Sequence, residues 1–435
     1  NRFLFLSILN PGLRTKITQL NHLCFSVRSG LRNTGFYFHR SLGFPLTRQD
    51  ASQPDSMSEL NRHYQELLNN DLLQWTNQRT FSRCLGIGGQ GVVYLSAREG
   101  ADGFNIPVAL KLFSPKRYDS SAVYQAEMAR LAQVAARVAR VQENHLVAIQ
   151  NFVTRNHIYI MEMEWIDGYD LRSLLTPATF KQIREQVTSR RWRNINNNVF
   201  TKGVQQPRLK PGIAVAILRE CLAALAALHR NEIIHCDMKP ANIMLKRSGN
   251  AKIIDIGSAI DLNNLPCNQP CTPTYAAPEV LSGGRATPQS DLASLGYILI
   301  EVITGFQPFA NLKYAQLIKA KQNILQQLPQ WFPAEEFALS EPLMKLIHRL
   351  VHPDPAQRFQ SAEAADLSED GAADFHRLLV KSDLPSDYEN ELRRWIEEVE
   401  TDYFDEGHFS SDPDTTVFTT EYLNQQSQND SALEF

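Results

Sequence analysis

The segment from Ile233 to Leu245 constrains the fold and chemistry of this chain more than any other. It reads Ile-Ile-His-Cys-Asp-Met-Lys-Pro-Ala-Asn-Ile-Met-Leu, so a carboxylate (Asp237), an ammonium (Lys239) and an amide (Asn242) share one turn between apolar runs. A buried polar group needs a partner or a task. A second carboxylate, Asp255, ends a β-type run shortly afterwards. Together these groups can accept a proton, neutralise a phosphate and bind a metal ion, as a phosphoryl-transfer site requires.

These residues resemble the signature of protein kinases. The run from His235 to Asn242 is similar to the catalytic loop H-R-D-x-x-x-x-N, and Asp255-Ile256-Gly257 is similar to D-F-G. The Lys-Pro pair after Asp237 is that of serine/threonine kinases. The resemblance covers residues 80–365 in the expected order and is most like the bacterial members of the eukaryotic (Hanks) type. It implies an α+β, bilobal fold, with a small antiparallel β lobe carrying one helix and a larger, mainly α-helical lobe.

A glycine-rich stretch precedes this segment, with Gly86, Gly88 and Gly91 in the spacing G-x-G-x-x-G. By itself the motif is a weak signal, because dinucleotide-binding turns share it. A dinucleotide turn opens a helix, whereas Val92-Val93-Tyr94-Leu95 is β-branched and aromatic and predicts a second strand. We therefore expect a glycine hairpin whose backbone N–H groups can lie over phosphates.

The next predicted strand contains Lys111 in Val-Ala-Leu-Lys-Leu, which is similar to V-A-I-K. A lysine between apolar residues has a buried stem and needs a partner for its charge. The expected partner is Glu127, in a helix predicted over 124–141. Alone, Lys111 could equally be a surface lysine and Glu127 a solvated helix residue; the series of motifs favours the ion pair.

The resemblance implies a role for each matching position. Asp237 accepts or orients the acceptor proton, Lys239 neutralises the transferring phosphoryl group, and Thr272 bonds both. Asn242 and Asp255 bind Mg²⁺, with Mn²⁺ as an alternative. The hinge between the lobes is 164–168, Met163 before it is the gatekeeper or ordinary core filler, and Asp170 meets the ribose. The residues implied to bind ATP are Gly86, Gly88, Gly91, Val93, Ala109, Lys111, Glu127, Met163, Glu164, Ile166, Asp170 and Met244.

The run Thr272 to Glu279 resembles the end of a kinase activation segment, where the acceptor peptide docks. By this resemblance Glu279 pairs with Arg358, and Asp291 holds the backbone of the catalytic loop. Asp291 could instead cap a helix. Cys267 and Cys271 could form a redox pair or half of a metal site, but free thiols are the better interpretation because a second set of ligands is missing.

Two positions depart from the family pattern. Cys236 replaces the arginine of H-R-D, which commonly clamps a phosphorylated activation loop, so we expect that phosphorylation of this loop is not the switch. Ile256 replaces the phenylalanine of D-F-G, and an aliphatic side chain can fill the same apolar site.

Residues 1–56 are basic and free of acids before Asp50. We interpret them as upstream sequence from a misplaced start or as a transit peptide, without a part in the fold. Residues 57–79 are expected to form a flanking helix with Leu60, Tyr64 and Leu67 on its apolar face. The kinase domain then spans a small lobe at 80–163, the hinge and a large lobe at 169–365.

A basic insertion at 176–211 is the least typical part of that large lobe. It could dock an acidic partner, a substrate or the chain's own acidic tail, but a solvated, mobile loop is the favoured interpretation. In the acidic tail at 366–435 one helix is expected over 388–399, with Leu392, Trp395 and Ile396 on one face, followed by disorder.

Composition limits the remaining possibilities. The formal net charge of −3 gives no sign of a nucleic-acid partner. No apolar run was found that reaches membrane-spanning length, the most apolar region being 292–306. Six scattered cysteines favour a reducing compartment, and hence the cytoplasm. The oligomeric state is left open.

The sequence therefore predicts an ATP-dependent serine/threonine protein kinase that acts on protein substrates in signalling. Two alternatives remain: a pseudokinase that binds nucleotide and works as a scaffold, and a small-molecule phosphotransferase with a kinase-like core.

Overall fold

The computed structural model describes residues 56–69, 72–74, 78–266, 271–332, 341–381 and 388–399. Every structural statement below refers to these residues. The basic leader before Ser56, Cys267 and the tail beyond Val399 lie outside them, so the interpretations of those parts stay predictions.

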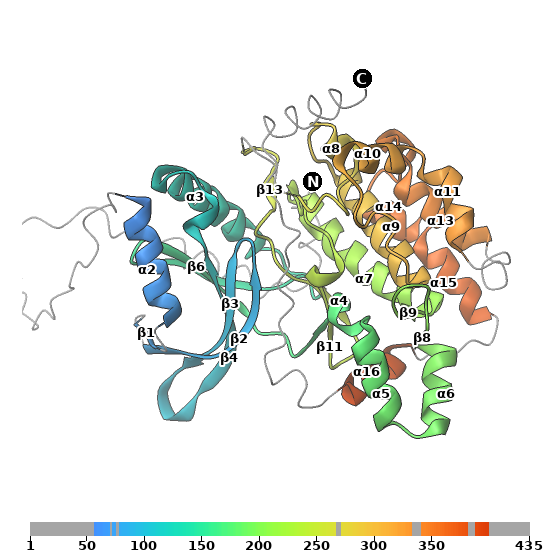
Figure 1. The fold of residues 1–435 in the computed structure, drawn as a ribbon, viewed down its shortest axis with the longest axis horizontal. Helices are drawn as coiled ribbons and strands as arrows, with labels where there is room; N and C mark the ends of the chain where they lie inside the picture. The colour runs from blue at the N-terminus through green and yellow to red at the C-terminus, as the bar shows by residue number, and fades with distance from the viewer. Residues whose placement is uncertain are drawn as a thin grey trace, which may run out of the picture. The chain divides into compact units, whose positions relative to one another are not determined.

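The small lobe is built on a six-stranded antiparallel sheet with the strand order β1-β2-β3-β4-β6-β5 (Figure 1). The glycine-rich turn joins β2 to β3, so the expected hairpin is present. β4 carries Lys111 in the middle of the sheet, where the residue lies opposite Val93 on one side and Met161 on the other. The strands are β1 Leu72–Gln74, β2 Gln78–Gly88, β3 Gly91–Glu99, β4 Asn105–Phe113, β5 Ile149–Arg155 and β6 Ile158–Glu164.

Two helices accompany this sheet. α3 (Ser121–Val138) begins at Ser120, whose side chain accepts a hydrogen bond from the Val123 N–H, and it packs against β5. α2 (Met57–Asn69) buries Leu60, Tyr64 and Leu67 against the lobe, beside β6. The apolar run at 145–149 reads as a strand in the sequence, but in the structure β5 begins only at Ile149, and Leu146 makes an isolated bridge to Ile253.

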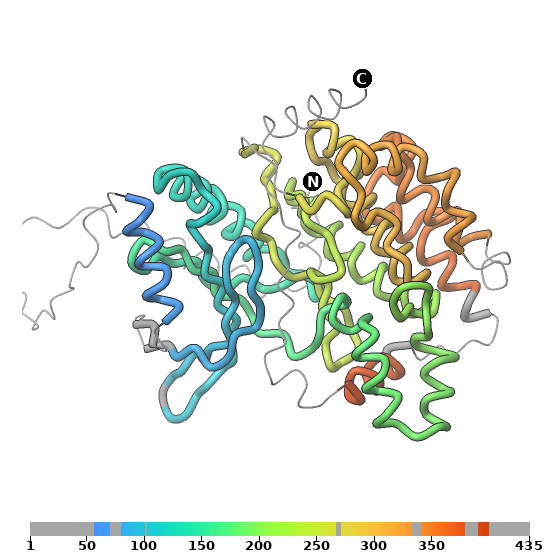
Figure 2. Tube along the Cα trace, in the orientation of Figure 1, coloured from blue at the N-terminus to red at the C-terminus, as the bar shows by residue number. Residues whose placement is uncertain are grey.

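The chain leaves the sheet after β6 and enters the large lobe through β7 (Gly168–Asp170) (Figure 2). β7 pairs with β11 (Ile243–Lys246), which pairs with β12 (Ala251–Ile253). A second small ladder joins β10 (Ile233–Ile234) to β13 (Ile260–Asp261). The catalytic-loop segment therefore lies between β10 and β11, and Asp255 follows β12, so both are held at the ends of short strands.

α7 (Pro211–Arg230) is the central helix of the large lobe and packs against α9 (Pro288–Thr304), α14 (Ala362–Leu367) and α15 (Ala372–Lys381). In the described part of the chain it alone is long and apolar enough to cross a membrane, a candidate that the sequence analysis missed. Its most apolar window is 72% buried within the lobe, which accounts for its composition as a core helix. This lobe also contains α4 Leu171–Leu174, α8 Pro278–Leu281, α10 Tyr314–Gln322, α11 Ile324–Trp331 and α13 Glu341–Val351.

The interpretation of 176–211 as a solvated loop is wrong. The segment forms α5 (Pro177–Gln186), α6 (Ser189–Asn198) and the pair β8 (Phe200–Thr201) and β9 (Arg208–Leu209). Thr176 and Thr188 cap the two helices with their side chains. Four asparagines, a residue type that favours loops, lie within α6 because caps and packing outweigh their weak helix propensity: Asn194, Asn196, Asn197 and Asn198.

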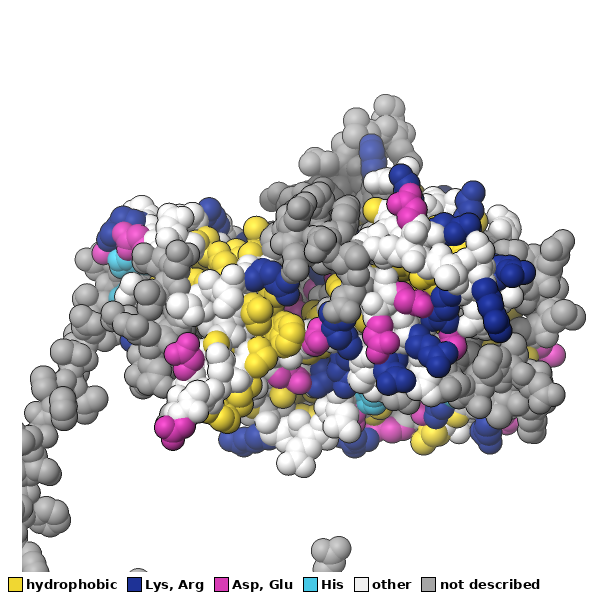
Figure 3. Space-filling view, turned by 90° about the horizontal axis from the view of Figure 1, so that it is seen from below, with side chains coloured by type: hydrophobic (Ala, Val, Ile, Leu, Met, Phe, Trp, Pro, Cys, Tyr) yellow, Lys and Arg dark blue, Asp and Glu magenta, His cyan; other side chains and the backbone are white. Residues whose placement is uncertain are grey.

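Basic side chains concentrate on the exposed side of this insertion. Seen from below, the large lobe carries many Lys and Arg side chains (Figure 3). Those of the insertion that are exposed are Lys181, Arg184, Arg190, Arg193 and Lys202.

α16 (Tyr388–Glu398), the expected tail helix, docks on the insertion. Arg191 forms ion pairs with Glu391 at 2.7 Å and Glu398 at 2.6 Å. Trp395 is fully buried, and its ring centroid lies 4.8 Å from that of Phe200. Of the interpretations weighed for the insertion, docking of the chain's own acidic tail is the one that these contacts support.

Candidate active site

Asp291, in the first turn of α9, holds the backbone of the catalytic loop. Its two carboxylate oxygens accept hydrogen bonds from the N–H groups of His235 and Cys236, each at 2.9 Å. Cys236 has φ of +66°, a left-handed conformation that is strained for a residue with a side chain. The cap of α9 is Thr287. The alternative of Asp291 as a helix cap is therefore wrong, and the buried carboxylate stabilises a strained turn.

Asp237, Lys239 and Thr272 meet around one carboxylate. The Thr272 hydroxyl donates to Asp237 Oδ1 at 2.5 Å, and Lys239 Nζ lies 3.2 Å from Asp237 Oδ2. Lys239 also donates to Thr272 Oγ1 at 3.4 Å, and the Asn242 amide donates to the Asp237 carbonyl at 2.7 Å. All four residues are buried. The structure thus brings together the three residues expected to be catalytic, although 35 positions separate two of them.

Asp255 and Lys111 form an ion pair that joins the two lobes. Lys111 Nζ lies 2.5 Å from Asp255 Oδ1, which also accepts a hydrogen bond from the Gly257 N–H at 2.9 Å. Burial alone would raise the pKa of Asp255, but the Lys111 ammonium and this N–H stabilise the carboxylate and lower its pKa to about 2. Asp255 is therefore ionised at neutral pH.

The expected pair between Lys111 and Glu127 is not formed in this structure. Glu127 instead makes a bidentate contact with Arg130 one turn along α3, at 2.7 and 2.9 Å. Lys111 turns to Asp255 and to Gln90 Oε1, 2.6 Å away. The physical reason is local: an arginine three residues away on the same helix satisfies the glutamate without any movement of the helix.

The glycine-rich turn shows why its glycines differ. A side chain at Gly91 would lie 1.9 Å from the Leu112 carbonyl oxygen, and its φ of +146° also requires glycine. Side chains at Gly86 and Gly88 would meet nothing within 4 Å. The fold therefore requires glycine only at Gly91. At Gly86 and Gly88 the space beside the backbone is open, so a ligand could come close to it.

Four of the residues expected to bind ATP lie on strands of the two lobes. Ala109 on β4 pairs in register with Met163 on β6, and both are buried. Val93 on β3 and Met244 on β11 are partly buried. Their contact with a nucleotide stays a prediction.

The hinge side chains have local partners. Glu164 Oε1 accepts from Lys252 Nζ at 2.5 Å and from the Ala148 N–H at 2.6 Å, while Ile166 is buried. Asp170 caps α4, with both carboxylate oxygens bonded by Ser173. Contacts of the hinge backbone with adenine and of Asp170 with ribose therefore stay predictions, and Asp170 has a structural task that the sequence did not suggest.

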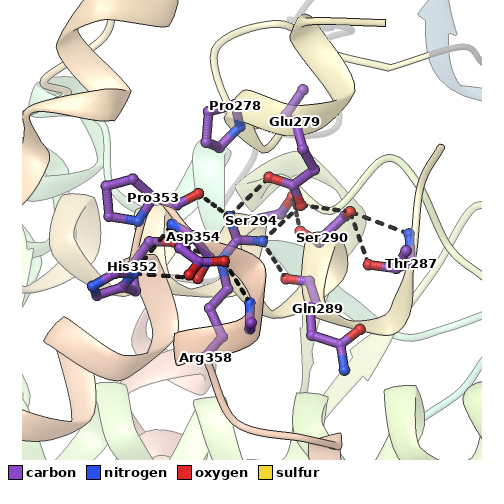
Figure 4. Close-up of polar contacts among 12 residues, drawn as sticks. Pro278, Glu279, Thr287, Gln289, Ser290, Ser294, His352, Pro353, Asp354 and Arg358 are labelled. Carbon is purple, nitrogen blue, oxygen red and sulfur yellow. Dashed lines mark hydrogen bonds and ion pairs between the residues drawn. The ribbon is translucent and has the colours of Figure 1, made fainter. Parts of the chain in front are cut away.

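The end of the activation segment is anchored as expected. Glu279 forms a bidentate ion pair with Arg358, at 2.7 and 2.8 Å, and also accepts from the Ser290 hydroxyl (Figure 4). Arg358 additionally bonds backbone carbonyls of Gln289 and His352. Burial opposes the charge of Glu279, but Arg358 lowers the pKa of this carboxyl below its ordinary value. This pair fixes the position where the activation segment enters the helical lobe.

A family model of the protein kinase domain matches residues 79–368, more than half of the chain. The chain belongs to the protein kinase family. Its bilobal α+β fold is that of a protein kinase domain, and the family uses ATP and a divalent metal ion.

Curated relatives of this kinase domain include bacterial and plant proteins. It is 32% identical over 284 residues to "Serine/threonine-protein kinase PknD" of Mycobacterium tuberculosis, a match that covers 64% of this chain and 37% of that protein. It is 26% identical over 304 residues to "Serine/threonine-protein kinase PrkC" of Bacillus subtilis, covering 69% and 41%. A plant protein, "CBL-interacting serine/threonine-protein kinase 24" of Arabidopsis thaliana, is 31% identical over 194 residues, covering 43% and 40%. The chain thus spans about two fifths of each relative, and the comparisons support a protein serine/threonine kinase.

Of the two departures of this kinase domain from the family pattern, Ile256 is buried and Cys236 is half-buried. Ile256 is fully buried and fills its site with an aliphatic side chain, as expected. Cys236 lines a small pocket with Cys271, Ala276 and Val280. Burial raises the pKa of the Cys236 thiol well above its ordinary value, so the thiol is neutral. A neutral thiol cannot hold a phosphate as an arginine does.

Three residues of the kinase domain were missed by the sequence analysis. Gln90 at the tip of the glycine-rich turn is buried and bridges Lys111 and the Ser258 hydroxyl, the latter at 2.9 Å. Arg130 pairs with Glu127 and donates to the Ala259 carbonyl at 3.1 Å. Lys321 contacts the activation segment. The spacing of Arg130 from Glu127 could have indicated that pair; no pattern in the sequence indicates the other two contacts.

Proposed function

We propose that this chain is an ATP-dependent serine/threonine protein kinase that transfers the γ-phosphoryl group of ATP to hydroxyl groups of proteins. The observation that carries the proposal is the contact of Asp237 with Thr272 and Lys239 inside a kinase fold. A carboxylate held next to an ammonium can orient an acceptor hydroxyl while the cation offsets the charge of the transferring group.

The donor set near Asp237 fits Mg²⁺. A hard cation prefers oxygen ligands, and in nucleotide sites it takes only one or two from the protein and the rest from phosphates and water. Asp255 offers an ionised carboxylate, and Asn242 uses its NH₂ group toward Asp237, which leaves its amide oxygen for a cation. Bound there, Mg²⁺ would neutralise charge on the phosphates; Mn²⁺ has the same preference for oxygen.

Nucleotide binding requires Lys111 and Glu127 to exchange partners. In the structure the Lys111 ammonium is satisfied by Asp255 and Gln90, and Glu127 by Arg130. Phosphate oxygens could take the place of the Gln90 amide oxygen, because both are acceptors for the same ammonium. Gln90 and Arg130 are therefore the groups that must move for Lys111 to hold phosphates and Glu127 to hold Lys111.

Phosphorylation of the activation segment is not the proposed switch. Cys236 supplies a neutral thiol where an arginine would be needed. Of the hydroxyl residues from 258 to 274, Ser258 and Thr272 are buried and bonded to Gln90 and Asp237. These observations support a kinase whose resting state is set by the contacts of Lys111 and Glu127.

The proposed location is the cytoplasm. In the described part of the chain Cys84, Cys221, Cys236 and Cys271 are free thiols, which supports a reducing compartment. Its substrates are proposed to be proteins, because the segment after Thr272 is anchored by Glu279 and Arg358 next to the catalytic carboxylate.

Transfer of labelled phosphate from ATP to myelin basic protein in the presence of Mg²⁺ tests the proposal. The wild-type chain should transfer, and Asp255→Ala should reduce the rate about a hundredfold or more, because the metal ligand and the partner of Lys111 are both lost. Asp119→Ala, which changes an exposed carboxylate, is the matched control and should keep the wild-type rate.

The alternatives give different results in the same assay. Nucleotide binding without transfer by the freshly purified chain would favour a pseudokinase scaffold and contradict the proposal. Transfer to sugar or aminoglycoside acceptors but not to protein would favour a small-molecule phosphotransferase.

A further inference from the structure

Lys321, in α10 of the large lobe, is fully buried and points at the activation segment. Its ammonium donates to the carbonyl oxygens of Pro273 at 3.1 Å, Thr274 at 2.9 Å and Ala276 at 2.5 Å. A lysine ammonium has three N–H donors, and here each has a backbone acceptor from one stretch of four residues. The contact spans 45 to 48 positions of the chain.

Aromatic rings complete the surroundings of this cation. Lys321 Nζ lies 4.3 Å from the ring centroid of Tyr297 and 4.7 Å from that of Phe309. Ring faces attract a cation and exclude water. Burial imposes a desolvation cost on the charged form of the amine and so lowers the pKa of Lys321 well below its ordinary value. An apolar residue would fill the same space without this cost but would leave three carbonyl groups without a donor.

The stretch that Lys321 holds lies beside the catalytic carboxylate. Thr272, directly before it, donates to Asp237, and the Tyr275 carbonyl within it accepts from the Ser294 hydroxyl at 2.8 Å. The carbonyl groups of residues 273 to 276 are therefore all bonded to α9 or α10. By the resemblance to the end of a kinase activation segment, this is the stretch on which an acceptor protein docks, and its backbone is held by α9 and α10.

We propose that Lys321 is a positioning residue for the protein acceptor: it fixes the backbone of residues 273–276 as a platform on which the acceptor chain docks. The inference rests on the proposed kinase function. Lys321 touches neither nucleotide groups nor Asp237 and acts through the platform alone. Its loss raises the KM for the protein acceptor and leaves the KM for ATP unchanged.

The test compares Lys321→Met with Lys319→Met, a matched change of an exposed lysine on the same helix. With myelin basic protein as acceptor, Lys321→Met raises the KM for protein about tenfold, because three hydrogen bonds that hold the platform are lost, while the KM for ATP stays within about twofold. Lys319→Met keeps both constants within about twofold of wild type. A folded Lys321→Met variant with the wild-type KM for protein overturns the inference.

A second measurement tests the role of Lys321 independently of kinase activity. Amide hydrogen exchange of residues 271–277 should be faster in Lys321→Met and unchanged in Lys319→Met; equal rates in all three proteins overturn the anchor. If the wild type transfers no phosphate, the proposed function fails, and the exchange rates still decide on Lys321. If Lys321→Met does not fold, Lys321→Gln, which keeps two N–H donors, should give an intermediate KM for protein, and a wild-type value overturns the inference.

Discussion

At the scale of single residues, Asp237 and Lys111 show how the buried charges of this site are paired or hydrogen-bonded in the absence of nucleotide. Asp237 is surrounded by hydrogen-bond donors from Lys239, Thr272 and Asn242. The Asn242 side-chain amide donates to the backbone carbonyl of Asp237 and, at 3.3 Å, to its Oδ2. Lys111 is neutralised by Asp255. Each buried charge thus has an opposite charge or a donor within hydrogen-bond distance, which offsets the cost of its desolvation.

The ion pair of Lys111 and Asp255 predicts how stability depends on pH. Because the pKa of Asp255 falls from its ordinary 3.8 to about 2 on folding, its contribution is complete above about pH 4 and is lost as the pH falls from about 4 to about 2. Wild type should be more stable than Asp255→Asn at pH 6, and the difference should shrink within that window. Urea unfolding at pH 6, 4, 3 and 2.5 measures it.

Asp119→Asn, which changes an exposed carboxylate to an amide in the same way, serves as the control for this pH series. A difference between wild type and Asp255→Asn that stays constant down to pH 2.5 would show that the pair does not lower the pKa of Asp255.

At the scale of elements, α16 joins the tail to the body of the kinase domain. The helix buries Leu392, Trp395 and Ile396 and places Glu391 and Glu398 on Arg191 of α6. It also packs against α7 and β11, the strand that follows the catalytic loop. The insertion and α16, which look like separate surface additions in the sequence, therefore pack together on the large lobe.

Loss of the Trp395 side chain should undock α16. Truncation of a fully buried aromatic residue to alanine costs about 3 kcal/mol, so Trp395→Ala should speed amide exchange of residues 388–398 by about two orders of magnitude. Arg393→Ala, an exposed change on the same helix, should leave exchange within about twofold of wild type. Unchanged exchange in Trp395→Ala would mean that the helix is not held by this face.

At the scale of the whole kinase domain, the state of the enzyme is decided by contacts between segments far apart in sequence. Lys111 with Asp255, Gln90 with Ser258 and Arg130 with the Ala259 carbonyl all join the small lobe to the segment after β12. All three contacts join protein groups to one another and involve no phosphorylated side chain. Under the proposed function, contacts to nucleotide would replace that of Lys111 with Gln90.

The activity of the domain should not depend on phosphate attached to its activation segment. Treatment with a protein phosphatase, followed by its removal, should leave the rate of transfer to myelin basic protein within about twofold of a mock-treated sample, because Cys236 cannot clamp a phosphate. A fall of more than about tenfold in the transfer rate, reversed by incubation with ATP, would refute this prediction and point to another phosphate-binding residue.

The sequence by itself determined the family and the two lobes and indicated the residues that gather around Asp237, because motifs such as the Asp237 loop and the glycine turn combine residue type with spacing. It also indicated the Glu279–Arg358 pair and the role of Asp291, which the structure places as expected. Only the tertiary structure decided the partners of Glu127 and Lys111, the helical insertion and the contacts of Lys321. Each of these depends on which of several chemically suitable partners the fold brings nearest. Local residue patterns do not show that distance.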